Sequence, residues 1–269
     1  MIPFVKAHAC GNDFLILNDE LCAAEPRDSL ARRLCDRNRG VGADGAEFLE
    51  GRKQRSGSIR LYNADGSIAE ISGNGTRCVA AWIGYETAAR PGDEIVLETD
   101  AGVRVCRIAS RGERSFDIAS AMGIPRIEEM VLQLDGGRKI AGATVSIGNP
   151  HFVVMVEDRR FFVEGAPWQS LGEEICRHAA FPRQTNVEFV RMRSAGEIEI
   201  RIFERGVGPT ASSGTGTCAA AAAAIHRRGA NPALLVSSPG GTQAVHWPGA
   251  DSEMTLTGPA ELICRGEAF

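Results

Sequence analysis

Two serines occupy positions at which a hydroxyl could stand beside a bound anion. Ser72 and Ser213 are each followed by Gly-x-Gly-Thr and then by a segment typical of a helix, residues 77–84 and 218–226. Glycines at a helix start let backbone N–H groups face a ligand, and the helix dipole favours negative charge there. The pattern therefore suits an amino-acid carboxylate, although a tight turn that packs a helix against strands has the same pattern.

The two serines belong to an internal repeat. Residues 59–76 align without a gap with residues 200–217, and six of the 18 positions are identical. Each copy opens with an alternating strand and leads through a glycine-rich loop to the helix. The second helix is small and apolar all round, which indicates a helix enclosed by protein. If the two halves face each other, two helix starts meet at one cleft, with a serine on each side of a substrate α-carbon.

The elements that must position these serines are mostly strands. Helices are expected at residues 28–35 and 168–178. Alternating or short apolar segments predict strands at residues 58–62, 93–99, 104–108, 143–147, 152–156, 187–190, 197–203 and 234–237. The fold class is α+β, with two pseudo-symmetric halves, each a mostly antiparallel sheet around a central helix. The expected halves are residues 1–113, completed by 261–269, and residues 114–260, with the active site in the cleft between them.

Composition excludes several classes of function. The net charge of −4 and the scattered basic residues argue against nucleic acid as a partner. The longest apolar run, residues 218–225, is too short for a membrane span, and no signal peptide is evident at the N-terminus, so a cytoplasmic protein is expected. The eight cysteines have no metal-ligand spacing and are expected to be buried apolar residues, so no metal site is predicted.

Lysine usage bears on the cofactor. The chain has three lysines, Lys6, Lys53 and Lys139, and the last two lie in turn-like segments. A pyridoxal-phosphate enzyme needs a Schiff-base lysine in a phosphate-binding site. Amino-acid chemistry in this chain is therefore expected to run without a cofactor.

The residues around the serines resemble the diaminopimelate epimerase family. The segments that carry the likeness follow in order: residues 8–14 (HACGNDF), 39–45 (RGVGADG), 63–78, 148–151 (GNPH), 185–188 (TNVE) and 204–219. The resemblance spans His8 to about Gly229. It implies the diaminopimelate epimerase-like fold, a small diamino diacid as substrate, and a homodimer as the common assembly.

In this family two cysteines act as a thiolate–thiol pair on opposite faces of the substrate α-carbon, and Ser72 and Ser213 occupy their places. A thiol has a pKa near ~8.5 and is readily ionised, whereas an alkyl hydroxyl is a far weaker acid and needs an adjacent base. Cys78 and Cys218 lie further along their helices and do not replace the thiols. The resemblance thus implies interconversion of LL- and meso-2,6-diaminopimelate without the acid–base pair that normally performs it.

The resemblance also assigns the remaining site residues. His151 and Glu204 match the family positions that contact the amino group and assist the cysteine pair. Arg205 suits bidentate binding of a distal carboxylate. The positions that match substrate-binding residues are Asn12, Asn63, Gly73, Asn74, Asn149, Asn186, Glu204, Arg205, Gly214 and Thr215.

Three functions remain open at this point. The first is the epimerase. The second is a related cofactor-independent isomerase or dehydratase that uses Glu204 or His151 as its single base. The third is a non-catalytic amino-acid-binding relative. Turnover in heavy water separates the three functions. The epimerase predicts deuterium uptake at the α-carbon with inversion, and the single-base enzyme predicts exchange or elimination without inversion. The binding protein predicts neither.

Overall fold

The computed structural model describes residues 1–69 and 72–269 and divides the chain into two compact units. Unit 1 comprises Met1–Ala121 and Thr257–Phe269, and unit 2 comprises Met122–Leu256. Unit 1 first ends at Ala121, which is later than the boundary expected after residue 113. Residues on both sides of position 113 pair in one hairpin, with Arg111 opposite Phe116. A boundary at residue 113 would cut this hairpin.

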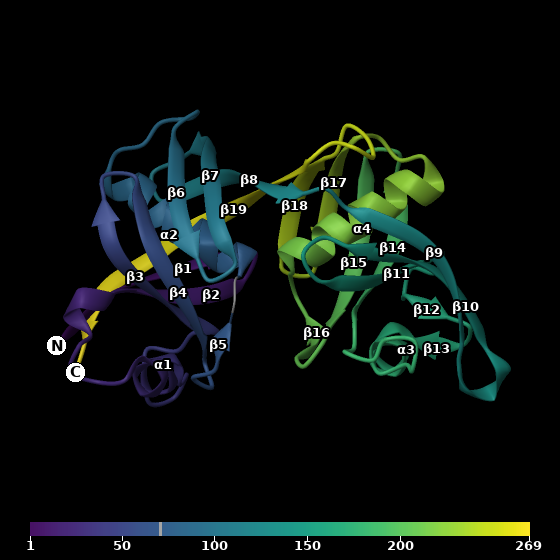
Figure 1. Ribbon diagram of the computed structural model, residues 1–269, viewed down its shortest axis with the longest axis horizontal. Coiled ribbons are helices and arrows are strands. Elements are labelled where there is room, and N and C mark those ends of the chain that lie inside the picture. The colour runs from purple at the N-terminus through teal and green to yellow at the C-terminus, as the bar shows by residue number, and fades with distance from the viewer. Residues whose placement is uncertain (70–71) are drawn as a thin grey trace. The chain divides into compact units, whose positions relative to one another are not determined.

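Unit 1 is a ring of strands around one helix (Figure 1). Its strands are β1 (Ile2–Ala9), β2 (Asn12–Asn18), β3 (Gly45–Lys53), β4 (Ser56–Asn63), β5 (Ile68–Ala69), β6 (Glu94–Thr99), β7 (Gly102–Arg111), β8 (Ser115–Gly123) and the later part of β19 (Met254–Ala268). Strands β2 and β3 are parallel, as are β4 and β6, whereas β1–β2, β3–β4, β6–β7 and β7–β8 are antiparallel. Strand β19 pairs with both β1 and β8, which closes the ring.

Unit 2 repeats this order of pairings. Its strands are β9 (Arg126–Gln133), β10 (Lys139–Ser146), β11 (Pro150–Met155), β14 (Asn186–Ser194), β15 (Glu197–Glu204), β16 (Gly208–Thr210), β17 (Ala233–Ser238) and β18 (Gly241–His246), with β12 (Phe162–Val163) and β13 (Ala166–Pro167) as a separate pair. Strands β11 and β14 are parallel, as are β15 and β17, and β10–β11, β14–β15 and β17–β18 are antiparallel. The predicted α+β class with two halves of one design is confirmed.

The central helices are α2 (Gly73–Glu86) in unit 1 and α4 (Gly214–Arg228) in unit 2. Helix α2 packs through Val79 and Ile83 against side chains from β6, β7 and β8. Helix α4 buries Ala219–Ala224 completely within a cluster that includes residues of β11, β15, β17 and β18. Six successive alanines leave room for strands on all sides of α4, which explains why its sequence is apolar all round.

The outer helices are α1 (Arg27–Cys35) and α3 (Trp168–Cys176), close to the predicted ranges. Leu30 and Leu34 of α1 pack on β2, β3 and β4, and Leu171 and Ile175 of α3 pack on β11 and β14. Strands β3 and β14 are therefore covered on both faces. The buried part of β3, residues 45–49, is apolar apart from Glu47, as such a position requires.

Candidate active site

Ser72 is the N-cap of α2. Its backbone is extended, with φ −123° and ψ 120°, and its Oγ accepts a hydrogen bond from the Gly75 N–H at 3.1 Å. Gly73 and Asn74 are the first helical residues, as the repeat predicts. Glu70 and Ile71, which belong to the repeat, lie outside the described residues. The serine hydroxyl thus sits at the positive end of a buried helix.

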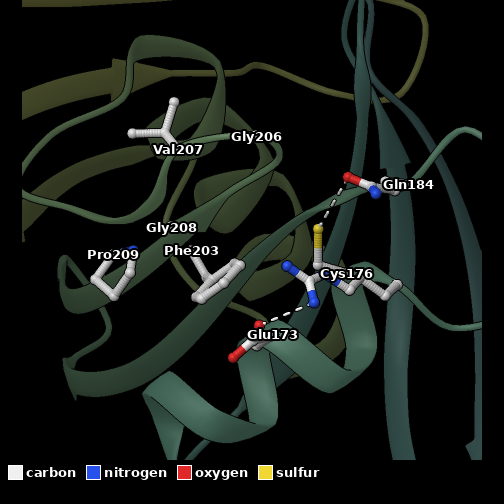
Figure 2. Close-up of a pocket in the computed structure, with 9 residues that line it drawn as sticks. Glu173, Cys176, Gln184, Phe203, Gly206, Val207, Gly208 and Pro209 are labelled. Carbon is white, nitrogen blue, oxygen red and sulfur yellow. Dashed lines mark hydrogen bonds and ion pairs between the residues drawn. The ribbon is translucent and has the colours of Figure 1, made fainter.

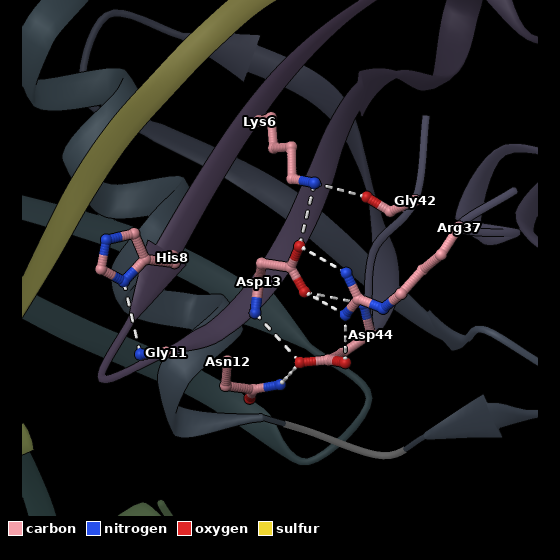
Figure 3. A network of polar contacts seen from close by, with 8 residues as sticks. All are labelled: Lys6, His8, Gly11, Asn12, Asp13, Arg37, Gly42 and Asp44. Atoms are coloured by element: carbon pink, nitrogen blue, oxygen red, sulfur yellow. Dashed lines mark hydrogen bonds and ion pairs between the residues drawn. The ribbon is translucent and has the colours of Figure 1, made fainter. Parts of the chain in front are cut away.

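Asn12 and Asn74 are brought together beside this helix start. Asn74 Nδ2 donates to Asn12 Oδ1 at 3.2 Å, and Asn12 Nδ2 donates to Asp44 Oδ2 at 2.7 Å. Figure 3 shows how Arg37 joins Asp44 and Asp13 behind Asn12, each at 2.8 Å. The amide of Asn12 is therefore oriented by an ion-pair network that the sequence did not reveal.

Asp13 is the charged centre of that network. Burial alone would raise the pKa of Asp13, but hydrogen bonds from Arg37 and Lys6 outweigh it and lower the pKa to about 2. Lys6 also donates to the Gly42 carbonyl at 2.6 Å. The carboxylate stays ionised at neutral pH and holds β1, β2 and the loop before β3 together.

Asn63 lies at the end of β4 and is exposed. Its Nδ2 donates to Ser67 Oγ at 2.9 Å within its own turn. In this structure Asn63 serves as a turn residue, and its predicted role in substrate binding stays a prediction.

Ser213 is the N-cap of α4 and is a close counterpart of Ser72. Its Oγ accepts a hydrogen bond from the Gly216 N–H at 3.3 Å, and Gly214 and Thr215 follow as the first helical residues. Ser213 also hydrogen-bonds Glu204, the last residue of β15. Burial raises the pKa of Glu204, and the bond to Ser213 offsets only part of that effect. A carboxyl with a raised pKa beside a hydroxyl is suited to proton transfer.

His151 anchors a second chain of contacts in unit 2. Its Nδ1 lies 2.8 Å from Glu188 Oε1, and its Nε2 lies 2.8 Å from Asn149 Oδ1. Asn149 Nδ2 donates to Thr215 Oγ1 at 3.3 Å, so the chain ends on the first turn of α4. Burial raises the pKa of Glu188, although the nearby His151 partly offsets it. Three of the predicted residues thus form one connected group.

Asn186 and Arg205 meet at the end of β15. Asn186 Nδ2 donates to the Pro150 carbonyl at 3.2 Å, and Asn186 Oδ1 accepts from the Arg205 N–H at 3.0 Å. The Arg205 guanidinium donates to the Arg183 carbonyl at 3.0 Å. Asn186 therefore fixes the backbone that carries Arg205, a role that differs from direct contact with a ligand.

Sequence reasoning missed two buried carboxyls. Glu47 in β3 and Glu188 in β14 are 1% and 0% exposed, and both face the first turn of the central helix of their unit. Their positions differ by the same offset as Ser72 and Ser213, and each is followed by a phenylalanine. Extending the repeat towards the N-terminus would have found the pair.

The cysteines nearest to the two serines lie in the core. Cys78 and Cys218 are fully buried in the clusters around α2 and α4. Burial raises the pKa of the Cys78 thiol far above its usual value. Since the thiolate is the reactive form, Cys78 does not supply the acid–base group that Ser72 lacks.

A cavity of about 410 Å³ lies in unit 2 between α3 and the β15–β16 hairpin. Figure 2 shows its lining, which includes Glu173, Cys176, Gln184 and Phe203. Its polar contacts are a Glu173–Arg177 ion pair at 3.1 Å and a contact of 3.9 Å between Cys176 Sγ and Gln184 Oε1. None of the predicted site residues lines this cavity.

Two kinds of feature are absent from residues 1–69 and 72–269. Within these ranges no cluster of three or more His, Cys, Asp or Glu side chains could hold a metal ion. No helix in the same ranges is long and apolar enough to cross a membrane.

Comparison with known proteins covers both units. The family model for diaminopimelate epimerase matches residues 4–128 and 143–263. A diaminopimelate epimerase from Moorella thermoacetica is 37% identical over 279 residues, which is 98% of each chain. One from Xanthomonas campestris is 35% identical over 281 residues, or 99% of this chain and 96% of the relative.

Solved structures of lower identity share the fold. A probable proline racemase from Agrobacterium radiobacter aligns with a TM-score of 0.69 at 17% identity, over 100% of this chain and 93% of that one. A hydroxyproline epimerase from Agrobacterium vitis aligns with a TM-score of 0.67 at 18% identity, over 98% and 90%. At such identities the likeness concerns the fold alone.

Proposed function

The chain belongs to the diaminopimelate epimerase family, and from this premise we propose that it interconverts LL- and meso-2,6-diaminopimelate by exchange of the α-proton without a cofactor. The observation that carries the proposal is the pair of matching helix starts. Each has a serine N-cap whose Oγ binds the N–H three residues later. Each also has an asparagine that bonds the second residue of the helix.

The proposed roles follow from these contacts. The free N–H groups at the two helix starts are suited to an α-carboxylate. The His151, Asn149 and Glu204 group is suited to the α-amino group, and Arg205 to the distal carboxylate. The proposal requires both serines to act on one α-carbon, each beside a group that can take or supply its proton.

Turnover in D₂O tests the proposal. The chain is incubated with LL-2,6-diaminopimelate, and product configuration and α-deuterium are followed by chiral chromatography with mass spectrometry. We expect meso product carrying one solvent deuterium at the inverted carbon. Exchange or elimination without inversion would favour a single-base isomerase or dehydratase, and no change would favour a binding protein; either result overturns the proposal.

Restoring the thiols gives a sharper version of the same test. The double variant Ser72→Cys/Ser213→Cys is expected to invert the substrate at least about 100-fold faster, because thiols ionise far more readily than hydroxyls. A matched control is Ser110→Cys/Ser194→Cys, which places one thiol at an exposed position in each unit. An inactive Ser72→Cys/Ser213→Cys variant would show that the rest of the site does not support epimerisation.

A further inference from the structure

The carboxyl of Glu47 is buried without a hydrogen-bond partner. Its side chain is 1% exposed inside unit 1, and within the described part of the chain neither carboxyl oxygen makes a hydrogen bond. Burial raises the pKa of Glu47 from 4.5 to about 8, so the group is protonated at neutral pH. A buried polar group without a partner lowers stability, which makes Glu47 a candidate for a functional role.

Glu47 points at the helix start that carries Ser72. A Cβ added at Gly75 would lie 2.0 Å from Glu47 Oε1, so only a glycine leaves room for the carboxyl. The N–H of the same glycine binds Ser72 Oγ at 3.1 Å. The carboxyl and the serine hydroxyl therefore both lie against one residue in the first turn of α2.

The corresponding carboxyl in unit 2 is already engaged. Glu188 approaches Gly216, where an added Cβ would lie 2.8 Å from Glu188 Oε1, but it is paired with His151 at 2.8 Å. His151 stands opposite Asn186 in the parallel pairing of β11 with β14. Glu188 therefore serves to hold His151 in place.

In unit 1 the position of that histidine is taken by Phe14. Phe14 stands opposite Gly45 in the parallel pairing of β2 with β3, and Gly45 precedes Glu47 by two residues as Asn186 precedes Glu188. The Phe14 ring lies beside Gly75, with Cε1 3.4 Å from a Cβ added at that glycine, and a phenyl ring has no group that could hydrogen-bond the carboxyl. Within the part of the chain that the structure describes, the Glu47 carboxyl therefore has no hydrogen-bond partner that would hold its proton.

We propose that Glu47 acts through Ser72 as the proton-holding group of unit 1, in place of the thiol that this helix start lacks. This inference rests on the proposed function. Ser213 has its own carboxyl in the half-buried Glu204, so each helix start has one carboxyl beside it: Glu47 lies against Gly75 in the turn that Ser72 caps, and Glu204 hydrogen-bonds Ser213.

Under the proposed function the proton transfers balance. In one direction the substrate Cα–H bond breaks, its proton passes to Ser213 Oγ, and the Ser213 hydroxyl proton passes to the Glu204 carboxylate. The electron pair stays on the substrate as a carbanion. The Ser72 hydroxyl proton then forms the new Cα–H bond, and the Glu47 proton replaces it on Ser72 Oγ. Turnover in the opposite direction, or exchange with water, restores both carboxyls.

Glu47→Gln tests the inference because it keeps the shape of the side chain and removes the transferable proton. We expect inversion of both stereoisomers to fall at least about 100-fold, the scale of general acid–base catalysis. We also expect exchange of the α-proton with D₂O to persist for only one stereoisomer, the one whose α-proton is taken in unit 2. Glu47→Asp is expected to restore part of the inversion. The control is Glu50→Gln, an exposed glutamate on the same strand, with unchanged rates.

Several outcomes would decide the matter. Circular dichroism and urea unfolding establish that Glu47→Gln is folded. If the role of Glu47 is purely structural, the variant will lower the α-proton exchange of both stereoisomers equally, and that result overturns the inference. Inversion that survives Glu47→Gln within about threefold overturns the inference but leaves the proposed function intact. A wild-type chain that neither exchanges nor inverts overturns both.

The pH profile adds a readout independent of the amount of folded protein. In the direction that needs Glu47 protonated, the wild-type rate is expected to fall as the pH rises through about 8, the pKa to which burial raises this carboxyl. The residual rate of Glu47→Gln should not show this fall near pH 8. If the fall in rate near pH 8 persists unchanged in Glu47→Gln, it belongs to the titration of another group, and the inference is overturned.

Discussion

In unit 2 the buried Glu188 has His151 as a partner at 2.8 Å, whereas in unit 1 Phe14 occupies the strand position that corresponds to His151, and both Phe14 and Glu47 lie against Gly75. The strands that carry these residues have the same pairings in both units, and both carboxyls press against the glycine in the first turn of the central helix. The difference shows that one topology supports two kinds of polar interior. In unit 2 one carboxyl oxygen, Glu188 Oε1, is hydrogen-bonded to His151, whereas in unit 1 neither oxygen of Glu47 has a hydrogen-bond partner among the described residues.

The largest expected effect on stability comes from replacing His151 of unit 2 with phenylalanine, the residue at the corresponding position of unit 1. His151→Phe leaves the Glu188 carboxyl buried without a partner, so we expect the free energy of unfolding to fall by about 3–5 kcal/mol. Urea unfolding followed by circular dichroism measures the change. The double variant His151→Phe/Glu188→Leu should recover most of the loss. A loss below about 1 kcal/mol for His151→Phe would mean that Glu188 finds another partner.

The next effect comes from removing the unpaired acid of unit 1. The folded-state pKa of Glu47, about 8, lies above its ordinary value of 4.5, so the unfolded chain releases this proton first as the pH rises. The stability that Glu47 contributes in its protonated form is therefore lost as the pH rises from about 4.5 to 8. Glu47→Leu should raise the free energy of unfolding by about 3 kcal/mol at pH 7 and by much less at pH 4.5.

Urea unfolding of wild type and Glu47→Leu at several pH values from 4.5 to 8.5 measures this difference. Burial raises the pKa of Glu188 and Glu204 as well, so the difference between the two proteins, and not either curve alone, isolates Glu47. A pH-independent difference would contradict an ionisable, unpaired Glu47.

The smallest effect compares the two N-caps. Ser72→Ala and Ser213→Ala each remove a cap hydrogen bond, so each is expected to lower the free energy of unfolding by about 1 kcal/mol. Ser213→Ala should lower it more, because this change also removes a hydrogen bond to the half-buried Glu204. Thermal unfolding with Ser110→Ala as an exposed control tests the order. Equal losses would indicate that Glu204 does not depend on Ser213.

Much of the fold followed from periodicity. The repeat predicted two similar halves, the two serine-capped helix starts and the strands that precede them, and α2, α4, β4 and β15 lie where it placed them. Local sequence suffices for these elements, because a cap, a glycine turn and an apolar helix are all specified by neighbouring residues. The strands that were not predicted are β1, β2, β3, β5, β8, β9, β12, β13, β16, β18 and β19.

By itself the sequence determined the family, the α+β class and the identity of the two capping serines. The tertiary structure alone decided which distant groups share a proton or a charge. Parallel pairing of β11 with β14 joins His151 to Glu188, and parallel pairing of β2 with β3 places Phe14 at the corresponding position, where Glu47 has no hydrogen-bond partner among residues 1–69 and 72–269. The reason is physical: burial and hydrogen-bond partners depend on which strands become neighbours, and no local pattern encodes the pairing of parallel strands.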